Sequence, residues 1–345
     1  MNKIKSIFQI VPGFGLALII AAVAKWLESL LPIHLIGASV IALFIGMLIN
    51  HFWKPSAMLS GGLKFTSKKI LKFAIILLGA SLSIGTILEV GKLSLTVMFF
   101  TLLTCFGGGY FVGKALGLNW KLSNLISAGT GICGGSAIAA IAPVIDAEDS
   151  DIAYAISATF LFDMAMIVLF PIMGQAMGLS DMAYGLWAGT AVNDTSSVVA
   201  AGYAYSEAAG DFATMVKLTR TLSIIPTVIV FALIEVNIKR KAALGAGSSK
   251  EIKTNVKFTK IFPWFILGFI ALAIINSFGV IPTSVSGTLK TLSKFLMIAA
   301  LAAIGLNTSF KDMKKSGIQP MVHGFIISAL VVIVAIAVEY FMGLV

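Results

Sequence analysis

Apolar and polar positions follow one another along this chain in long blocks, and the apolar blocks recur from the first residues to the last. Most apolar blocks are about 20 residues long, which is the length that an α-helix needs to cross a bilayer. Helices are expected because a lipid-exposed span must satisfy its own backbone polar groups, and the blocks lack the alternation of barrel strands. The pattern predicts eleven spans, near residues 11–31, 35–52, 70–90, 93–114, 122–145, 152–176, 184–205, 212–236, 262–280, 290–309 and 319–342.

Composition favours an integral membrane protein over a water-soluble globule. The 345 residues are 58% hydrophobic and 12% charged, whereas about a quarter of the residues of a soluble domain are charged. Because apolar blocks continue to the C-terminus, a lone signal peptide on a soluble domain is excluded. We expect one all-α membrane domain, with spans one to eight in residues 1–236, a basic cytoplasmic linker at 237–261, and spans nine to eleven in 262–345.

Basic residues predict the orientation, because short loops rich in Lys and Arg stay in the cytoplasm. With a cytoplasmic N-terminus and an outer C-terminus, 18 of the 25 basic residues fall inside. The net charge of +10 then follows from topology and needs no nucleic-acid partner, for which the sequence holds no motif. The inner residues are Lys3, Lys5, Lys54, Lys64, Lys68, Lys69, Lys114, Lys121, Lys239, Arg240, Lys241, Lys250, Lys253, Lys257, Lys260, Lys311, Lys314 and Lys315. The outer loops hold Lys92, Lys290 and the acidic cluster Asp146, Glu148, Asp149 and Asp151.

Two internal matches suggest the repeats from which many transporters are built. At an offset of 222 residues, Lys72-Phe73 matches Lys294-Phe295, and the two spans that follow run in opposite directions. A second match lies at an offset of 60 residues, and either a duplication or a composition bias toward Ala and Gly could explain it. This pair of spans, the fifth and the seventh, is inverted only if one segment is re-entrant. The second match aligns Ala128, Gly129, Thr130, Ser136, Ala140, Asp151 and Ala153 with Ala188, Gly189, Thr190, Ser196, Ala200, Asp211 and Ala213.

The fifth span, LISAGTGICGGSAIAAIAPVI at 125–145, is a poor helix. It has four glycines within seven residues, and each costs up to about 1 kcal/mol relative to Ala. Close packing through small residues is one explanation. We favour a helix broken near Gly134 and Gly135, because the seventh span repeats the pattern with stronger polarity. A second half-helix would start at Ser136 and direct free N–H groups and a positive dipole end into a cavity, which favours an anion.

The seventh span contains a polar block, AGTAVNDTSSVVAAG at 188–202. Asn193 or Asp194 is a natural N-cap, and Thr195, Ser196 and Ser197 follow in the first turn of a second half-helix. An ionised Asp at mid-membrane costs roughly 2.5 to 3.5 kcal/mol on insertion scales, so Asp194 should line a wet cavity, pair with a cation or titrate. Pure capping is the alternative, but intramembrane ionisable groups are functional by default.

The eighth span supplies two cations, Lys217 and Arg220, within VKLTRTLSIIP. Because they are three residues apart, both project from one helix face. Snorkelling of Lys217 to the outer surface is one explanation, whereas Arg220 lies deeper and has a fork of donors suited to an oxyanion. Asp163 in the sixth span, and Lys25 with Glu28 in the first, are further intramembrane charges.

Three stretches carry a resemblance to a known family. GICGGSAIAAIAPVI, WAGTAVNDTSSVVAAG and VKLTRTLSIIP resemble the signature stretches of the bacterial YeiH family of inner-membrane proteins, which is labelled a sulfate exporter family. The likeness covers nearly the whole chain, including KFAIILLGASLS. That family is similar in turn to cation–proton antiporters and bile-acid symporters, which implies an inverted repeat with two discontinuous helices. Relatives often have His where this chain has Asn193, so Asp194 would have to titrate alone.

These features together predict a secondary transporter that moves small anions by alternating access across the bacterial inner membrane. Export of sulfate or of a sulfonate-like oxyanion is the leading expectation. The expected substrate-binding residues are Gly134, Gly135, Ser136, Thr195, Ser196, Ser197, Lys217 and Arg220. A coupling ion, Na+ or H+, is expected at Thr130, Thr190, Asn193 and Asp194.

Two other classes stay open. A cation-coupled organic-acid symporter, or a cation–proton antiporter, would use Asp194 as its main binding group. A membrane enzyme or scaffold is disfavoured, because the sequence has no nucleophile–base pair and no metal-ligand spacing. No cofactor and no metal are expected. Apart from the lipid bilayer, the partner left open is a second copy in a homodimer.

Overall fold

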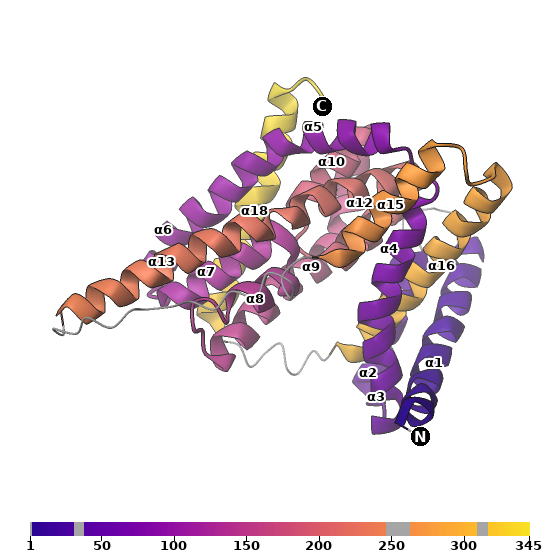
Figure 1. Cartoon of the computed structure of the whole chain (residues 1–345), viewed down its shortest axis with the longest axis horizontal. Helices are drawn as coiled ribbons and strands as arrows, with labels where there is room; N and C mark the ends of the chain where they lie inside the picture. Colours follow the sequence, from indigo (N-terminus) through magenta and orange to yellow (C-terminus); the bar gives the residue numbers. More distant parts are fainter. Residues whose placement is uncertain (1, 31–37, 246–262, 309–316) are drawn as a thin grey trace.

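The computed structural model describes residues 2–30, 38–245, 263–308 and 317–345, and this part of the chain is built from helices (Figure 1). The prediction of an all-helical membrane protein is therefore confirmed for the described residues. Within them, six helical segments are long and apolar enough to cross a membrane: Ile10–Leu30, Ile84–Ala115, Ser150–Ala176, Glu207–Ile238, Thr283–Asn307 and Ile318–Phe341.

The helices form two groups, which stand side by side in Figure 1. The first, called the companion bundle here, joins the N-terminal helices to two helices from late in the chain. Small residues allow its close packing: a Cβ built on Gly305 would lie 2.1 Å from the Leu43 carbonyl oxygen. The companion bundle contains α1 (Asn2–Leu30), α2 (Ala38–Phe52), α3 (Ala57–Phe65), the π-helical turn η1 (Thr66–Ile70), α4 (Leu71–Gly79), α15 (Trp264–Ser277) and α16 (Thr283–Asn307).

The second group, called the hairpin bundle, holds the middle of the chain and its last helix. Its contacts with the companion bundle are made mainly by α11 against α2 and α16, and by α5 against α15. The hairpin bundle contains α5 (Ile84–Leu103), η2 (Thr104–Gly108), α6 (Gly109–Ala115), α7 (Trp120–Ala128), η3 (Gly129–Cys133), α8 (Gly135–Ile141), α9 (Asp149–Ala176), α10 (Asp181–Ala191), α11 (Thr195–Tyr205), α12 (Glu207–Leu222), α13 (Ile224–Gly245) and α18 (Ile318–Phe341).

The predicted fifth span is a re-entrant hairpin. The helix α7–η3 ends at Cys133, Gly134 reverses the chain with φ +62°, and α8 begins at Gly135. A Cβ built on Gly129 would lie 2.8 Å from the Ile138 side chain, so residues on either side of the break lie together. At the open end, Lys121 Nζ donates to the Asp146 carbonyl oxygen at 2.7 Å. The hairpin therefore returns to the face that it left.

The predicted seventh span is a second hairpin. Its arms, α10 and α11, have 11 residues each, so each is about 16 Å long and reaches about halfway through the hydrocarbon core. The arms are antiparallel, because the Tyr184 hydroxyl donates to the Ala201 carbonyl oxygen at 3.0 Å and the Ser206 hydroxyl donates to Asp181 at 2.6 Å. The Tyr184 and Tyr205 rings stack with centroids 3.8 Å apart.

The two hairpins enter from opposite faces of the bundle. We call the face where α7 and α9 begin the lower face, and the face where α10 and α12 begin the upper face. Since α9 crosses between them, the open ends are separated by the full length of that helix, and Figure 1 shows α8 and α10 at opposite ends of the bundle. Break positions Gly134 and Asp194 are 60 residues apart, which is the offset of the second sequence match. That the hairpins are copies of one repeat stays a prediction.

Re-entrance corrects the expected topology. Two of the eleven apolar segments do not cross, so the acidic residues Asp146 and Asp151 lie on the same face as Lys121 rather than opposite it. The chain ends stay on opposite faces, because the number of membrane crossings is still odd when two of the eleven are removed. Which face is cytoplasmic stays a prediction, and the positive-inside pattern assigns the lower face.

Several predicted boundaries also change. The expected third span, 70–90, is interrupted by a turn between Gly79 and Ile84, and the chain instead forms one helix over 57–79 and another over 84–115. Ser83 caps the second of these by accepting from Thr86 N. Helix α13 extends to Gly245, into the segment expected to be a linker, and the rest of that segment lies outside the described residues.

Labelling of single cysteines tests the two hairpins. In a variant without Cys105 and Cys133, we expect Ser150→Cys to react with an impermeant maleimide from the same side as Lys114→Cys on α6. We expect Ala176→Cys to react from the same side as Ser284→Cys on α16. All four positions are exposed, so access decides the reaction. If the fifth and seventh segments crossed the membrane instead, Ser150→Cys would react from the side opposite to Lys114→Cys. Likewise, Ala176→Cys would react from the side opposite to Ser284→Cys.

Candidate functional site

The tips of the two hairpins meet inside the hairpin bundle. A Cβ built on Gly134, at the first tip, would lie 3.0 Å from Cβ and 3.0 Å from Oδ1 of Asp194, at the second tip. The positive φ of Gly134 is also rarely accessible to residues with a side chain. Glycine is therefore required at this position for the approach of the two tips as well as for the reversal of the chain.

Asp194 is the N-cap of α11. One carboxylate oxygen, Oδ2, accepts from the Ser196 backbone N–H at 2.8 Å and from the Ser196 hydroxyl. This pattern satisfies donors that the first turn of a helix leaves free. Of the two N-caps considered from sequence, Asn193 and Asp194, the structure selects Asp194. Its other oxygen, Oδ1, faces Gly134 and the start of α8.

Lys217 of α12 lies between the two tips and is fully buried. Its ammonium donates to the carbonyl oxygens of Ile132 and Val192, each at 2.9 Å, and to that of Asn193. An ammonium has three donors, and all three are used. Ile132 belongs to the first hairpin and Val192 to the second, so one side chain ties both tips together.

Arg220, one turn further along α12, is 1% exposed and acts in the same way. Its Nε donates to the Gly131 carbonyl oxygen at 2.7 Å, and its two terminal nitrogens donate to those of Thr130 and Val192. These carbonyls end the first arm of each hairpin, where a helix leaves four acceptors unsatisfied and carries a negative partial charge. Lys217 and Arg220 therefore cap two helix C-termini at once.

This arrangement rules out snorkelling of Lys217 and gives both cations a structural role that the sequence analysis did not predict. Lys217 does not snorkel to a surface, and Arg220 directs its donors at backbone carbonyls. The cations stabilise the broken helices at the carbonyl ends of their first arms. A direct contact of Lys217 or Arg220 with a transported anion stays a prediction.

Asp163 of α9 provides the complementary negative charge and is fully buried. Its two oxygens accept from the backbone N–H groups of Asn193 and Asp194, at 2.9 and 2.8 Å. These donors lie at the positive end of α11, where a carboxylate is stabilised. The tip of the second hairpin thus has cations at its carbonyl end and a carboxylate at its amide end.

The Asn193 side chain anchors the second tip to α9 and α18. Its amide nitrogen donates to the Ser328 hydroxyl at 3.2 Å and to the Thr159 carbonyl oxygen at 3.4 Å, and Ser328 lies 3.5 Å from the hydroxyl of Thr130. Asn193 Oδ1 is buried and has no hydrogen-bond partner, and the same holds for the Ser197 hydroxyl. Two unpartnered oxygens therefore lie on this hairpin, near its tip.

Of the remaining predicted site residues, some are accessible and one is turned away. Ser136 is exposed, and Gly135, Asp194 and Thr195 are half-buried. The Thr190 hydroxyl donates to the Leu186 carbonyl oxygen of its own helix at 2.7 Å. The accessible surface of the tips is thus formed by the starts of the second arms, with the cations buried underneath.

Sequence reasoning missed the supporting residues Asp163, Thr159 and Ser328. Asp163 was recognisable as an intramembrane carboxylate, but no local pattern connects it with a tip that lies 30 residues away. Ser328 is the one serine of the apolar helix α18, and its approach to Asn193 is visible only in three dimensions.

Comparisons with known proteins place the chain among bacterial membrane proteins. The family model for Conserved hypothetical protein 698 matches residues 12–324. A UPF0324 membrane protein of Clostridium tetani is 56% identical over 334 residues, covering 96% of this chain and 97% of that protein. One of Streptococcus mutans is 40% identical over 345 residues, covering 98% of each. Among solved structures, the sodium proton antiporter MjNhaP1 from Methanocaldococcus jannaschii aligns over 98% of each chain at 15% identity with a TM-score of 0.30. A likeness at that score supports no conclusion about fold or mechanism.

The capping role of Lys217 predicts a loss of stability that needs no ligand. Replacing it in Lys217→Met leaves the Ile132 and Asn193 carbonyls without their donor, at roughly 1–3 kcal/mol for each buried group. We expect the unfolding midpoint in detergent, without added anions, to fall by at least about 5 °C. Lys92→Met, at an exposed lysine of α5, is the matched control and should change little. An unchanged midpoint for Lys217→Met would contradict the capping role.

Proposed function

We propose that this chain, which belongs to the Conserved hypothetical protein 698 family of bacterial membrane proteins, is a secondary transporter of small oxyanions such as sulfate or a sulfonate. The observation that carries the proposal is the meeting of two oppositely oriented hairpin tips around one buried cation pair. The direction of transport expected from the family resemblance is export.

Transport requires a site that can be opened to either face, and the hairpins have the architecture for it. Discontinuous helices that place their ends near the midplane are the usual binding elements of secondary transporters. Here each tip belongs to a hairpin with its open end on a different face. A solute held between the tips is therefore about half a membrane from each side.

An anion is favoured by the groups that the tips present. The exposed Ser136 and the half-buried Gly135 and Thr195 begin the second arms of the hairpins, where N–H groups and the positive dipole end point outward. Lys217 and Arg220 donate to the carbonyls that end the first arms, which lie only a few residues before these groups in each hairpin. We place the oxyanion on the Ser136 and Thr195 hydroxyls.

Asp194 makes the proposed binding dependent on a cation. Its carboxylate is half-buried at the point where the tips meet, with Oδ1 beside Gly134. An anion bound there meets a like charge in a medium of low dielectric constant, which is strongly unfavourable. A proton or Na+ on Asp194 removes this repulsion, so anion and cation bind together.

A second function, cation transport centred on Asp194, is favoured by one specific observation. Asn193 Oδ1 and the Ser197 hydroxyl are buried oxygens without hydrogen-bond partners, and oxygen ligands suit a hard cation such as Na+. In this alternative the protein moves Na+ or H+ as its cargo, with or without an organic acid.

Thermal unfolding of the purified protein separates the two functions. We would add sulfate, thiosulfate, sulfite, sulfonates and dicarboxylates, at two pH values, with and without Na+. A ligand at 100 times its Kd stabilises by about 2.7 kcal/mol, so binding is visible as a rise of several degrees. If the proposed function is right, one oxyanion raises the unfolding midpoint, and the rise is larger at the lower pH or with Na+. Ser136→Ala should lower the affinity for that oxyanion about fivefold. Ser150→Ala, at an exposed serine away from the tips, is the control.

The variant Asp194→Asn decides the coupling. It removes the negative charge, so we expect an oxyanion to bind with no dependence on Na+ and with a reduced dependence on pH. A response to Na+ or pH alone, without any anion and lost in Asp194→Asn, would refute oxyanion transport and establish the cation function.

A further inference from the structure

An oxyanion on the hairpin tips needs a cation whose donors are free to bind it. Lys217 and Arg220 carry positive charge at the tips, but they donate to the carbonyls that end the first arms. An ammonium has three donors, and all three donors of Lys217 are used in this way. A charge-assisted hydrogen bond to the anion, the strong kind, therefore has to come from a further cation.

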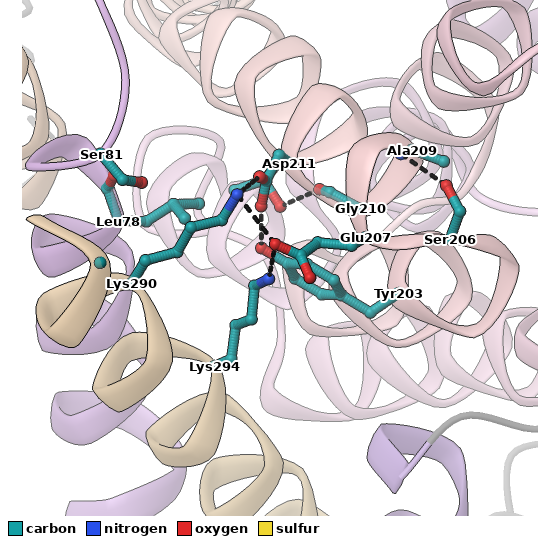
Figure 2. A network of polar contacts seen from close by, with 12 residues as sticks. Leu78, Ser81, Tyr203, Ser206, Glu207, Ala209, Gly210, Asp211, Lys290 and Lys294 are labelled. Atoms are coloured by element: carbon teal, nitrogen blue, oxygen red, sulfur yellow. Dashed lines mark hydrogen bonds and ion pairs between the residues drawn. The ribbon is translucent and has the colours of Figure 1, made fainter. Parts of the chain in front are cut away.

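Two lysines of α16 lie between the bundles, but both are already paired with carboxylates of α12 (Figure 2). Lys290 lies 2.7 Å from Asp211 Oδ2 and 3.0 Å from Glu207 Oε1. Lys294, one turn further along α16, pairs with the same Glu207 oxygen, and its ammonium lies 5.6 Å from the centroid of the Tyr203 ring. These ion pairs join the companion bundle to α12 and commit both lysines.

Lys72 of α4 is the counterpart of Lys294 in the sequence match at an offset of 222 residues, and it is not committed. Among the side chains that the structure describes, it has no ion pair and no hydrogen-bond acceptor. Its ammonium lies 5.4 Å from the centroid of the Phe265 ring, which is a cation–π contact. The Lys72 side chain is exposed, so its charge and its three donors are available to a ligand.

The position of Lys72 along its helix is unusual for an unpaired charge. The helix is continuous from Ala57 to Gly79, and at the α-helical rise Lys72 lies about 22 Å from its start and about 10 Å from its end. The Ser293 hydroxyl donates to the Ala74 carbonyl oxygen at 2.6 Å, so Lys72 is level with the middle of α16. Charged side chains at such a depth are costly in lipid, and they mark the pathways of substrates or ions.

The charge of Lys72 acts on the tip of the first hairpin. Its ammonium is close enough to Cys133 for an electrostatic interaction, and Cys133 is the last residue of η3, directly before the reversal at Gly134. Helical side chains lean toward the N-terminus of their helix, so the ammonium is directed away from Gly79, the nearer helix end. Lys72 therefore faces the tip rather than snorkelling to that end.

We propose that Lys72 binds the transported oxyanion and holds it against the hairpin tips. The anion accepts from the Lys72 ammonium on one side and from the Ser136 and Thr195 hydroxyls on the other. An anion with several oxygens, as sulfate or a sulfonate has, bonds to both sides at once. This inference rests on the proposed transport function, because it supplies the positive charge for the oxyanion of that function.

An anion in this position contacts both bundles. Lys72 belongs to the companion bundle, whereas Ser136 and Thr195 belong to the hairpin bundle. The affinity for the anion then depends on how the two bundles are placed relative to each other. A ligand shifts a conformational equilibrium only through such a difference in affinity, so Lys72 links anion binding to movement between the bundles.

Sulfate binding to the purified protein tests the role of Lys72. Because a hydrogen bond to a charged group is lost, we expect Lys72→Gln to raise the sulfate concentration needed for half of the rise in unfolding midpoint about tenfold. Lys72→Arg keeps the charge and should retain most of the affinity. Lys64→Gln, at an exposed lysine about two turns earlier in the same helix, is the matched control. Without sulfate, Lys72→Gln should unfold near the wild-type temperature, because only the contact with Phe265 is lost.

A second measurement needs no substrate. In the variant without Cys105 and Cys133, Ser136→Cys is labelled with two methanethiosulfonate reagents of similar size, one carrying a sulfonate and one a quaternary ammonium. The Lys72 charge should favour the anionic reagent, so Lys72→Gln should lower the ratio of anionic to cationic rate roughly fivefold. Lys64→Gln should leave this ratio nearly unchanged. An equal ratio with and without Lys72 would overturn its placement at the tips.

The two measurements separate this inference from the proposed function. If an oxyanion stabilises the wild type and Lys72→Gln at the same concentrations, oxyanion binding stands and the role of Lys72 is overturned. If Lys72→Gln removes the labelling preference while no oxyanion raises the wild-type midpoint, Lys72 stands as the group that draws anions to the tips, and oxyanion transport falls.

Discussion

A helix that stops inside a membrane leaves carbonyl groups without hydrogen-bond partners, and the structure depends on how these groups are satisfied. Water and lipid cannot do it in the hydrocarbon region. Lys217 and Arg220 satisfy the carbonyl ends of both broken helices, and they do so from one face of one helix, α12. Without these two side chains, neither hairpin tip could stay at mid-depth, and the surface that the tips present would not exist.

The same requirement explains why the site contains four charged side chains. Two buried cations are costly unless they are paired with negative charge or dipoles. The carbonyl ends supply part of this, and Asp163 and Asp194 supply the rest from the amide end of α11. With all four ionised, the formal charges balance, two positive and two negative. Adding an anion upsets that balance unless a cation or proton is added too, so the proposed coupling follows from the charges that hold the hairpins.

Local chemistry was readable in the sequence, but the path of the chain was not. Four glycines near 129–135 predicted the first break, and Asp194 followed by hydroxyl residues predicted the second cap. Re-entrance was hidden because two half-length apolar arms have the same hydropathy as one full span. The partners of Lys217 were hidden because they lie 24, 25 and 85 residues away. The third span was predicted to extend to residue 90 because apolar residues flank the turn at 80–83 and only Ser81 and Ser83 interrupt them.

Because α12 bonds both hairpin tips, the two hairpins cannot move independently of each other. Opening one tip would break its hydrogen bonds to Lys217 and Arg220. Buried carbonyls would then lack donors, which costs free energy. Motion between the bundles breaks none of these bonds, since the companion bundle contributes no hydrogen bond to the tips among the described residues. The contacts that must change are the packing of α11 against α2 and α16, the packing of α5 against α15, and the ion pairs of Lys290 and Lys294 with Glu207 and Asp211. Rigid-body movement of the whole hairpin bundle is therefore the least costly route by which the tips can become accessible from the other face.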